Sequence, residues 1–369
     1  MIEHISEVFS EVASTSDYSL IREKLSFEEK NYFLSNTSLF EFSDDISKIF
    51  EEDKQALFLA NYYKNDEALG LLKQISNYDN VLGVAAISSL SDDAIKMQYV
   101  DKVNYNDIKE TIILSFSNDE NKIRCLDKVE ESSIFSVINS LKTDEDKIKC
   151  LDKLQGDFER SKIVETFGND DDKIKGLNKI KDEECRATII SGFLDDEKKT
   201  QYLDSITSEY YKAMIVSSFL DDEKKIKCLD KIGTDEYRKI IIETFDNDDD
   251  KIKGLNKIKD EECRTTIISD FLNDEKKTQY LDGINNEQYR TRIILSFKND
   301  EEKIRCLDKI KNDSYKAKII SGFKSKEKRI ETLSRIKDGH ELSTLINSIG
   351  TDEELSEMLK GMNFEYYSA

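Results

Sequence analysis

The chain of 369 residues contains no proline and no tryptophan, and it has only 13 glycines. Proline and glycine mark most turns and linkers, so their scarcity removes the usual signs of domain boundaries. No run of 18 apolar residues occurs, which excludes a membrane-spanning helix by length. This composition favours many short helices joined by tight polar turns and disfavours a sheet protein.

Residues with metal-binding or redox chemistry are also scarce. The chain has two histidines, His4 and His340, and its cysteines form no C-x-x-C pair. No zinc-ligand spacing exists, so we expect no metal and no cofactor. The cysteines are interpreted as small buried side chains of a protein in a reducing compartment. They are Cys125, Cys150, Cys185, Cys228, Cys263 and Cys306.

Catalytic motifs are missing as well. The sequence contains no G-x-G-x-x-G, no G-x-x-x-x-G-K-[ST] and no G-x-S-x-G. Aspartate-rich runs such as residues 246–250 lack the fixed glycine and closing glutamate of an EF-hand loop. We therefore do not expect an enzyme.

What the chain has in excess is charge. Charged residues make up 36% of it, and the net charge is −21. Such a protein is repelled by phosphate backbones and anionic membranes, which disfavours general binding to either. The first residues are acidic where a secretory signal would be basic, so we expect a soluble, cytoplasmic protein.

An internal repeat explains the rest of the pattern. The eighteen residues NDDDKIKGLNKIKDEECR occur at 169–186 and again at 247–264, which is 78 positions later. A ladder of phenylalanines recurs every 26 residues: Phe167, Phe193, Phe219, Phe245, Phe271, Phe297 and Phe323. The ladder extends back through Leu141, Phe116 and Leu90, with one step of 25, and forward to Ile349. The duplication therefore spans three repeat units.

Each unit has the pattern of two short helices, as residues 236–260 illustrate. Tyr237, Ile241, Ile242 and Phe245 lie on one face of a first helix, and Leu255 belongs to the apolar face of a second. A residue able to cap a helix N-terminus precedes every second helix, and acidic residues follow it in the first turn. The predicted caps are Asn118, Thr143, Asn169, Asp195, Asp221, Asn247, Asn273, Asn299 and Ser325.

Tandem helix pairs, from DDAIKMQYVDKV at residue 92 to TDEELSEMLKGM at residue 351, resemble α-solenoids of the HEAT and TPR kind. The 26-residue unit is shorter than the repeat of either family, and the TPR pattern of Trp, Gly and Pro is absent. The fold class predicted is all-α: a right-handed α-solenoid of tandem antiparallel helix hairpins with a 26-residue period. We expect a capping region at 1–55, repeats at 56–348, and a C-terminal cap and tail at 349–369. The composition is also similar to that of helical-repeat proteins from AT-rich genomes, such as amoeba-infecting giant viruses or protists, which would imply a host cytoplasm.

Basic residues recur in the second half of each unit. The sixth position after each Phe-equivalent is basic: Lys96, Lys122, Lys147, Lys173, Lys199, Lys225, Lys251, Lys277, Lys303 and Arg329. Pairs at the eighth and twelfth positions form the candidate second-helix stripe: Lys175, Lys179, Lys227, Lys231, Lys253, Lys257, Arg305 and Lys309. The resemblance implies that second helices line a concave surface. The stripe is then either a groove for an acidic peptide or nucleic-acid backbone, or a charge-balanced face paired with the repeated Asp127, Asp152, Asp204, Asp230 and Asp308.

A second basic ladder begins the first helices, and local ion pairing is the simpler interpretation: Arg160, Arg186, Lys212, Arg238, Arg264, Arg290 and Lys316. The functional prediction is a non-enzymatic scaffold that binds other proteins. The alternative is an RNA- or single-strand-binding solenoid that uses the lysine stripe, which the acidic total opposes. A structural spacer without a groove is the third possibility. We expect protein partners, no membrane and a monomer.

Overall fold

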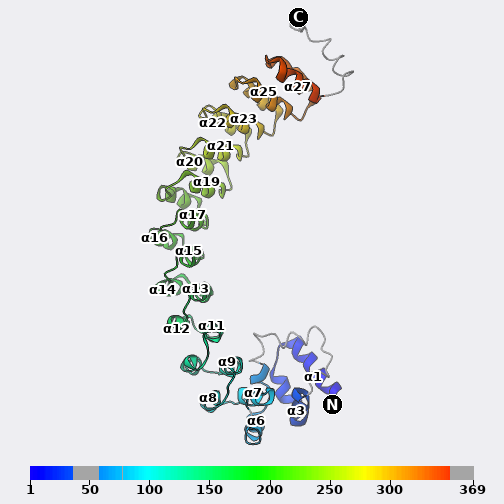
Figure 1. Cartoon of the computed structure of the whole chain (residues 1–369), viewed down its shortest axis with the longest axis vertical. Coiled ribbons are helices and arrows are strands. Elements are labelled where there is room, and N and C mark those ends of the chain that lie inside the picture. The colour runs from blue at the N-terminus through cyan, green and yellow to red at the C-terminus, as the bar shows by residue number, and fades with distance from the viewer. Residues whose placement is uncertain (36–57, 77, 350–369) are drawn as a thin grey trace. The chain divides into compact units, whose positions relative to one another are not determined.

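The computed structural model describes residues 1–35, 58–76 and 78–349, and these residues form helices and turns without any strand (Figure 1). Contacts divide the chain into two units, residues 1–189 and residues 190–369. No helix within the described ranges is both long enough and apolar enough to cross a membrane. The predicted all-α solenoid of tandem hairpins is confirmed, while its handedness stays a prediction.

The first unit begins with helices that lead up to Leu90, the first residue of the ladder. They are α1 (Ile2–Thr15), α2 (Ser19–Lys24), α3 (Phe27–Ser35), α6 (Asn65–Leu72) and α7 (Val81–Ser88). Their core is aromatic: the Phe9 and Phe33 rings are 4.5 Å apart, and the Tyr62 and Tyr63 rings are 5.0 Å apart. The helices predicted near residues 5–12 and 20–25 are confirmed. The predicted helical pattern at 43–50 and the C-terminal cap at 350–369 lie outside the described residues, and the predicted domain boundaries stay a prediction.

From α8 onward, each repeat contributes a first and a second helix. The first helices of the first unit are α9 (Asn106–Leu114), α11 (Glu131–Asn139), α13 (Asp157–Glu165) and α15 (Glu183–Ser191). Those of the second unit are α17 (Glu209–Ser217), α19 (Asp235–Glu243), α21 (Glu261–Ser269), α23 (Glu287–Leu295) and α25 (Asp313–Ser321), followed by α27 (Gly339–Ile349).

The second helices are α8 (Asp93–Val100), α10 (Asp119–Arg124), α12 (Asp144–Cys150) and α14 (Asp170–Leu177), then α16 (Asp196–Leu203), α18 (Asp222–Cys228), α20 (Asp248–Leu255), α22 (Asp274–Leu281), α24 (Asp300–Cys306) and α26 (Lys326–Glu331). Five are followed by a 3-10 turn: η3 (Leu126–Lys128), η4 (Leu151–Lys153), η5 (Leu229–Lys231), η6 (Leu307–Lys309) and η7 (Leu333–Arg335). First helices pack against first helices and second against second within each unit, which makes a first-helix layer and a second-helix layer (Figure 1).

The core between the layers confirms the predicted ladder. The Phe-equivalents from Leu90 to Phe323 are 1–3% exposed. Ile241 and Ile242 of the first helix and Leu255 of the second are fully buried. Because a single hairpin cannot cover both sides of its apolar stripe, each unit depends on its neighbours for burial.

All nine predicted caps of second helices are confirmed, because each side chain accepts a backbone N–H of the first turn. Asn247, for example, accepts from the N–H of Asp250 at 2.9 Å. The repeat helices are six to nine residues long. Helices this short are unstable alone, so caps and contacts between repeats must supply their stability.

Five of the six cysteines are buried, as expected, and Cys185 is half-buried. Cys125, Cys150, Cys228 and Cys306 occupy the ninth position after the Phe-equivalent, where the duplicated segment has glycine. A Cβ added at Gly254 would lie 2.7 Å from Cγ1 of Ile242, so the helices approach too closely there for a larger residue. The position is governed by packing.

Candidate interaction site

Carboxylates join several repeats to the next on the second-helix side. Asp248, the first residue of α20, accepts the N–H groups of Leu272 and Asn273 at 2.9 and 3.1 Å, in the loop of the following repeat. Asp93, Asp196, Asp274 and Asp300 make the same pair of bonds to residues 24 and 25 positions later. We call these inter-repeat bonds carboxylate staples. Because these carboxylates accept backbone N–H groups of the next repeat, they are engaged within the chain and do not bind a partner.

The first helices carry a second set of staples. Asp235 accepts the N–H groups of Lys259 and Asp260, both at 2.7 Å. Burial disfavours the ionised carboxyl, but these N–H bonds and Arg238 outweigh it and lower the pKa of Asp235. The same arrangement recurs at Asp157, Glu261, Glu287 and Asp313. The staples account for part of the acidic excess without invoking a basic ligand.

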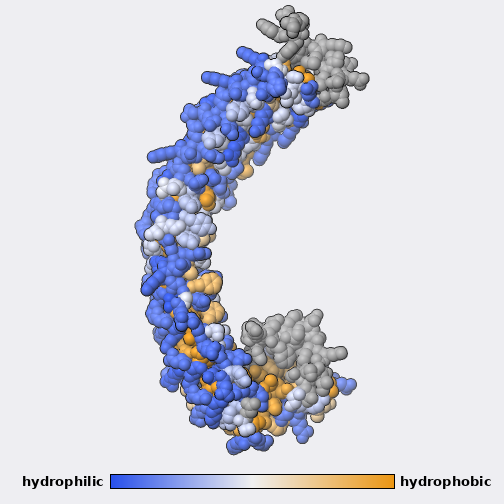
Figure 2. Space-filling view, in the orientation of Figure 1, coloured by the Kyte–Doolittle hydropathy of each residue, from blue (hydrophilic) through white to orange (hydrophobic). Residues whose placement is uncertain are grey.

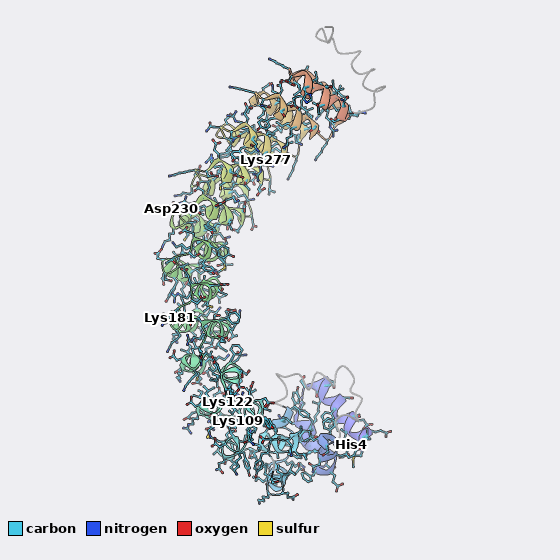
Figure 3. The ribbon with its side chains drawn as sticks, viewed as in Figure 1. His4, Lys109, Lys122, Lys181, Asp230 and Lys277 are labelled. Carbon is cyan, nitrogen blue, oxygen red and sulfur yellow. The ribbon has the colours of Figure 1, made fainter. Side chains whose placement is uncertain are left out.

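Six of the ten basic residues at the sixth position are buried and the other four are half-buried, whereas a surface stripe would need them exposed. Lys96, Lys122, Lys199, Lys225, Lys277 and Lys303 are only 2–6% exposed (Figure 3 labels Lys122 and Lys277). Nζ of Lys199 donates to the carbonyl of Ser218 at 2.7 Å, and Nζ of Lys277 donates to that of Ser296 at 2.9 Å. These carbonyls end the first helix of the next repeat, where the helix dipole favours a cation. Burial lowers the pKa of Lys96 to about 8.

The predicted stripe residues reach the surface, and each one has an acidic partner. Those at the eighth position pair within their own helix, as Lys253 does with Asp250 at 2.7 Å; the others are Lys175 with Asp172, Lys227 with Glu223 and Arg305 with Glu302. Those at the twelfth position pair with the preceding repeat, as Lys257 does with Asp230 at 2.8 Å; the others are Lys179 with Asp152, Lys231 with Asp204 and Lys309 with Asp282 (Figure 3 labels Asp230). These contacts favour the charge-balanced interpretation, and binding at the stripe stays a prediction.

The basic residue and the acid of a twelfth-position ion pair are either both present or both replaced. Where the twelfth position is Gly283 instead of lysine, the preceding repeat has Asn256 in place of aspartate. The same coordinated change occurs 78 residues earlier, at Ser205 and Asn178. Since the acid is absent where its cation is absent, the pair behaves as an internal unit of the scaffold.

The basic ladder of the first helices has a structural role too. Arg238 donates to the carbonyl of Leu229 at 3.1 Å and pairs with Asp235 at 2.7 Å. Arg264 donates to the carbonyl of Leu255, the last residue of α20, and to that of Ile258 in the turn that follows. The predicted local ion pairing is therefore only part of the account, because the main acceptors include carbonyls at helix C-termini.

The outer surface of the first-helix layer differs from that of the second. The ninth residue before each Phe-equivalent is exposed in every repeat and changes from one repeat to the next: Asp107, Ser132, Phe158, Glu184, Tyr210, Glu236, Glu262, Gln288 and Ser314. The eighth position after each Phe-equivalent, in the second helices, is restricted to Lys, Arg or Gln from α8 to α24 and is Glu331 in α26: Gln98, Arg124, Lys149, Lys175, Gln201, Lys227, Lys253, Gln279, Arg305 and Glu331. At these exposed positions the residue type varies little among the second helices and varies widely among the first helices.

Exposed apolar side chains of the repeats lie mainly on first helices and on loops that lead into second helices, where Leu194, Leu220 and Leu272 are 73%, 82% and 63% exposed. Phe158 of α13 is 63% exposed, Tyr210 of α17 is 57% and Ile240 of α19 is 43%. Within the described residues, none of the exposed large apolar side chains lies on the second helices α8 to α26. The second-helix side is mainly hydrophilic in Figure 2.

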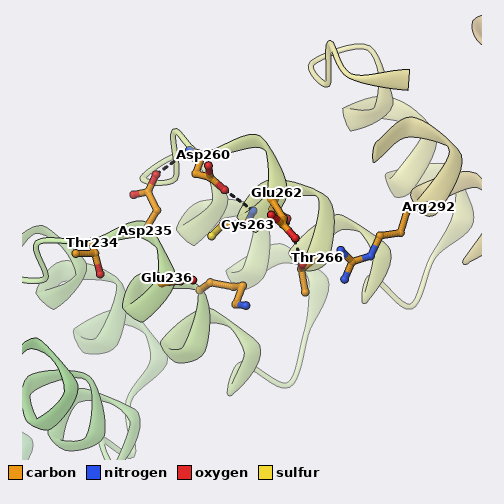
Figure 4. Close-up of a pocket in the computed structure, with 9 residues that line it drawn as sticks. Thr234, Asp235, Glu236, Asp260, Glu262, Cys263, Thr266 and Arg292 are labelled. Carbon is orange, nitrogen blue, oxygen red and sulfur yellow. Dashed lines mark hydrogen bonds between the residues drawn. The ribbon is translucent and has the colours of Figure 1, made fainter. Parts of the chain in front are cut away.

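Two hollows lie on the first-helix layer of the second unit. The larger, of about 470 Å³, lies over α19 and α21 and is lined by residues that include Glu236, Lys239, Glu262 and Arg292 (Figure 4). Asp235 and Asp260 also line it, but both accept backbone N–H groups at 2.7–2.8 Å. The adjacent hollow, of about 280 Å³, is lined by Glu262, Gln288, Tyr289, Thr291, Arg292, Leu295, Tyr315 and Lys318.

The residues that line the hollows include a thiol. Cys263 is their one cysteine, and burial raises its pKa to about 12, far from the thiolate form. Among the residues that the structure describes, no group of three His, Cys, Asp or Glu side chains is placed to hold a metal ion. In comparison with known proteins, the chain matches no protein-family profile and shows no significant similarity to a curated protein.

Proposed function

We propose that the protein is a non-enzymatic scaffold that binds other proteins through its first-helix layer. The observation that carries the proposal is the contrast between layers: exposed first-helix positions differ from repeat to repeat, whereas buried and stapling positions recur. Solvation alone does not require the exposed first-helix residues to differ between repeats, since the similar residues of the second helices already satisfy it. Individual side chains on a regular scaffold are typical of solenoids that present a binding surface.

Exposed aromatic and apolar residues support a protein partner. Phe158, Tyr210 and Ile240 offer contact area of the kind that anchors protein interfaces. The rings of Tyr210 and Tyr237 are 6.4 Å apart, so α17 and α19 together present an aromatic patch. Nucleic acid is a poorer fit, because the predicted lysine stripe is occupied by acids of the chain itself.

The test is affinity purification of the tagged chain from its native cells, with and without nuclease, using two matched variants. The first-helix variant carries Phe158→Ser, Tyr210→Ser and Ile240→Ser, and the second-helix control carries Lys175→Ser, Lys227→Ser and Lys253→Ser. We expect partners that resist nuclease, are retained by the control and are lost by the first-helix variant. Partners that vanish with nuclease, or that are lost only by the control, would contradict the proposal.

A further inference from the structure

Charge changes sign along the first-helix layer of the second unit. Helices α19 and α21 each contain one more acidic than basic residue, whereas α23 and α25 each contain one more basic than acidic residue. Although the whole chain is acidic, α23 and α25 therefore carry a net positive charge, and the smaller hollow lies on these two helices.

Two cations at this hollow have no partner. Arg292 of α23 and Lys318 of α25 are exposed, and no acceptor of the described chain pairs with either one. By contrast, every predicted cation of the second-helix stripe pairs with an acid. The nearby acids are already engaged: Glu287 and Asp313 staple the following loops, and Glu262 accepts from the hydroxyl of Tyr289 at 3.4 Å.

The two cations also have a defined spacing. Both stand five residues before a Phe-equivalent, and α23 packs directly against α25. Helices in contact lie about 8–10 Å apart, so equivalent side chains repeat at about that interval. Leu295 and the rings of Tyr289 and Tyr315 line the hollow between them.

We propose that the hollow on α23 and α25 binds an acidic segment of a partner protein in an extended, polyproline-II-like conformation. In that conformation, residues three apart point to the same side and are separated by about 9 Å, which matches the two cations. Two carboxylates at positions i and i+3 pair with Arg292 and Lys318, and an apolar side chain between them contacts Leu295 and the tyrosines. This rests on the proposed function and specifies its partner as acidic at this end of the layer.

The first experiment measures fluorescence anisotropy with the labelled peptide Gly-Glu-Pro-Leu-Glu-Pro-Gly. A Gln-for-Glu peptide and a labelled single-stranded oligonucleotide serve as comparisons. The site variant is R292Q with K318Q, and the control is K253Q with K257Q, which removes the same charge from the second helices. Both sets are exposed, so thermal melts of the variants should match that of the native chain.

We expect the acidic peptide to bind, the Gln peptide not to, and the site variant to lose about tenfold in affinity, as two charge-assisted contacts would give. The control should bind as the native chain does. Equal losses in both variants, or tighter binding of the oligonucleotide at the same site, would overturn the proposal.

The same variants distinguish failure of this site from failure of the scaffold proposal. If the site variant still captures the native nuclease-resistant partners but the acidic peptide does not bind, the scaffold function stands and this site is wrong. If nuclease releases all partners, the scaffold proposal itself fails.

Discussion

The two helix layers share one core but use their charges differently. In the second-helix layer, Lys253 pairs with Asp250 and Lys257 with Asp230, so the cations of the stripe are neutralised by the chain itself. In the first-helix layer, Arg292 and Lys318 have no partner, and apolar residues such as Tyr210 reach solvent. The difference indicates that residues which recur in every repeat stabilise the solenoid, whereas exposed residues that vary between repeats are available for contact with a partner.

The largest expected effect concerns the core, where the layers should not differ. Ile241→Asp in the first helix and Leu255→Asp in the second both place an unpaired charge at a fully buried site. We expect each to lower the free energy of unfolding by about 4 kcal/mol or more. Lys253→Ala should change it by less than about 0.5 kcal/mol. Denaturant unfolding followed by circular dichroism measures all three variants. If Lys253→Ala destabilised the chain as much as the two Asp variants, the assigned buried and exposed faces would be wrong.

The next effect concerns the carboxylate staples, which both layers contain. Asp248→Ala and Asp235→Ala each leave two backbone N–H groups without their acceptor. We expect a loss of about 2 kcal/mol in each case. Asp249→Ala is the control, because this neighbouring exposed acid only pairs with Lys276 and should cost less than about 1 kcal/mol. A control as damaging as the staple variants would show that the staples contribute nothing special.

A smaller effect should appear as a dependence on pH. Despite burial, N–H bonds and neighbouring cations hold the pKa values of Asp235 and Asp313 below the ordinary carboxyl value. Their stabilisation is thus complete above the unfolded pKa of about 3.9 and is lost as pH falls through the lower folded value. Between pH 5 and pH 3, we expect the native chain to lose about 1 kcal/mol more stability than Asp235→Ala does. Parallel pH profiles would mean that Asp235 titrates alike in both states.

The smallest effect concerns the exposed ladder pairs of the second-helix layer. A double-mutant cycle of Asp230→Ala and Lys257→Ala should give a coupling energy of about 0–1 kcal/mol that falls with added salt. The equivalent positions Asn256 and Gly283 serve as the comparison, since no ion pair is possible there. A coupling that salt leaves unchanged would show that the pair is more than a screened surface contact.

Much of the fold follows from the sequence because the repeat supplies the same evidence many times over. The phenylalanine ladder and the nine caps each depend on residues close in sequence, and all are confirmed. The staples could not be derived that way, since Asp248 and the two N–H donors that it binds lie 24 and 25 residues apart and equally acidic neighbours do not staple. Nor could pattern alone show that Lys277 is buried, because a lysine at helical spacing indicates a solvated face until the next repeat covers it.

The unpaired cations also could not be recognised from spacing. Arg292 and Lys318 stand at a position occupied in most other repeats by Ala, Thr, Ser, Met or Ile, so they form no ladder. The one other basic residue there is Lys162, which pairs with Glu165. The sequence signal for them is a departure from the repeat. Both basic residues lie on helices whose net charge is positive, although the chain as a whole is acidic. Only the contacts show which cations are left over.

Lysine labelling with an amine-reactive reagent, read by mass spectrometry, tests the division between layers most directly. It would be done on the native chain alone and in complex with its nuclease-resistant partners. The account predicts that unpaired Lys318 reacts faster than Lys253 and Lys257 in the free chain and becomes protected in the complex, while Lys253 and Lys257 stay unchanged. Protection of Lys253 and Lys257, with Lys318 unaffected, would contradict the account and assign binding to the second-helix layer.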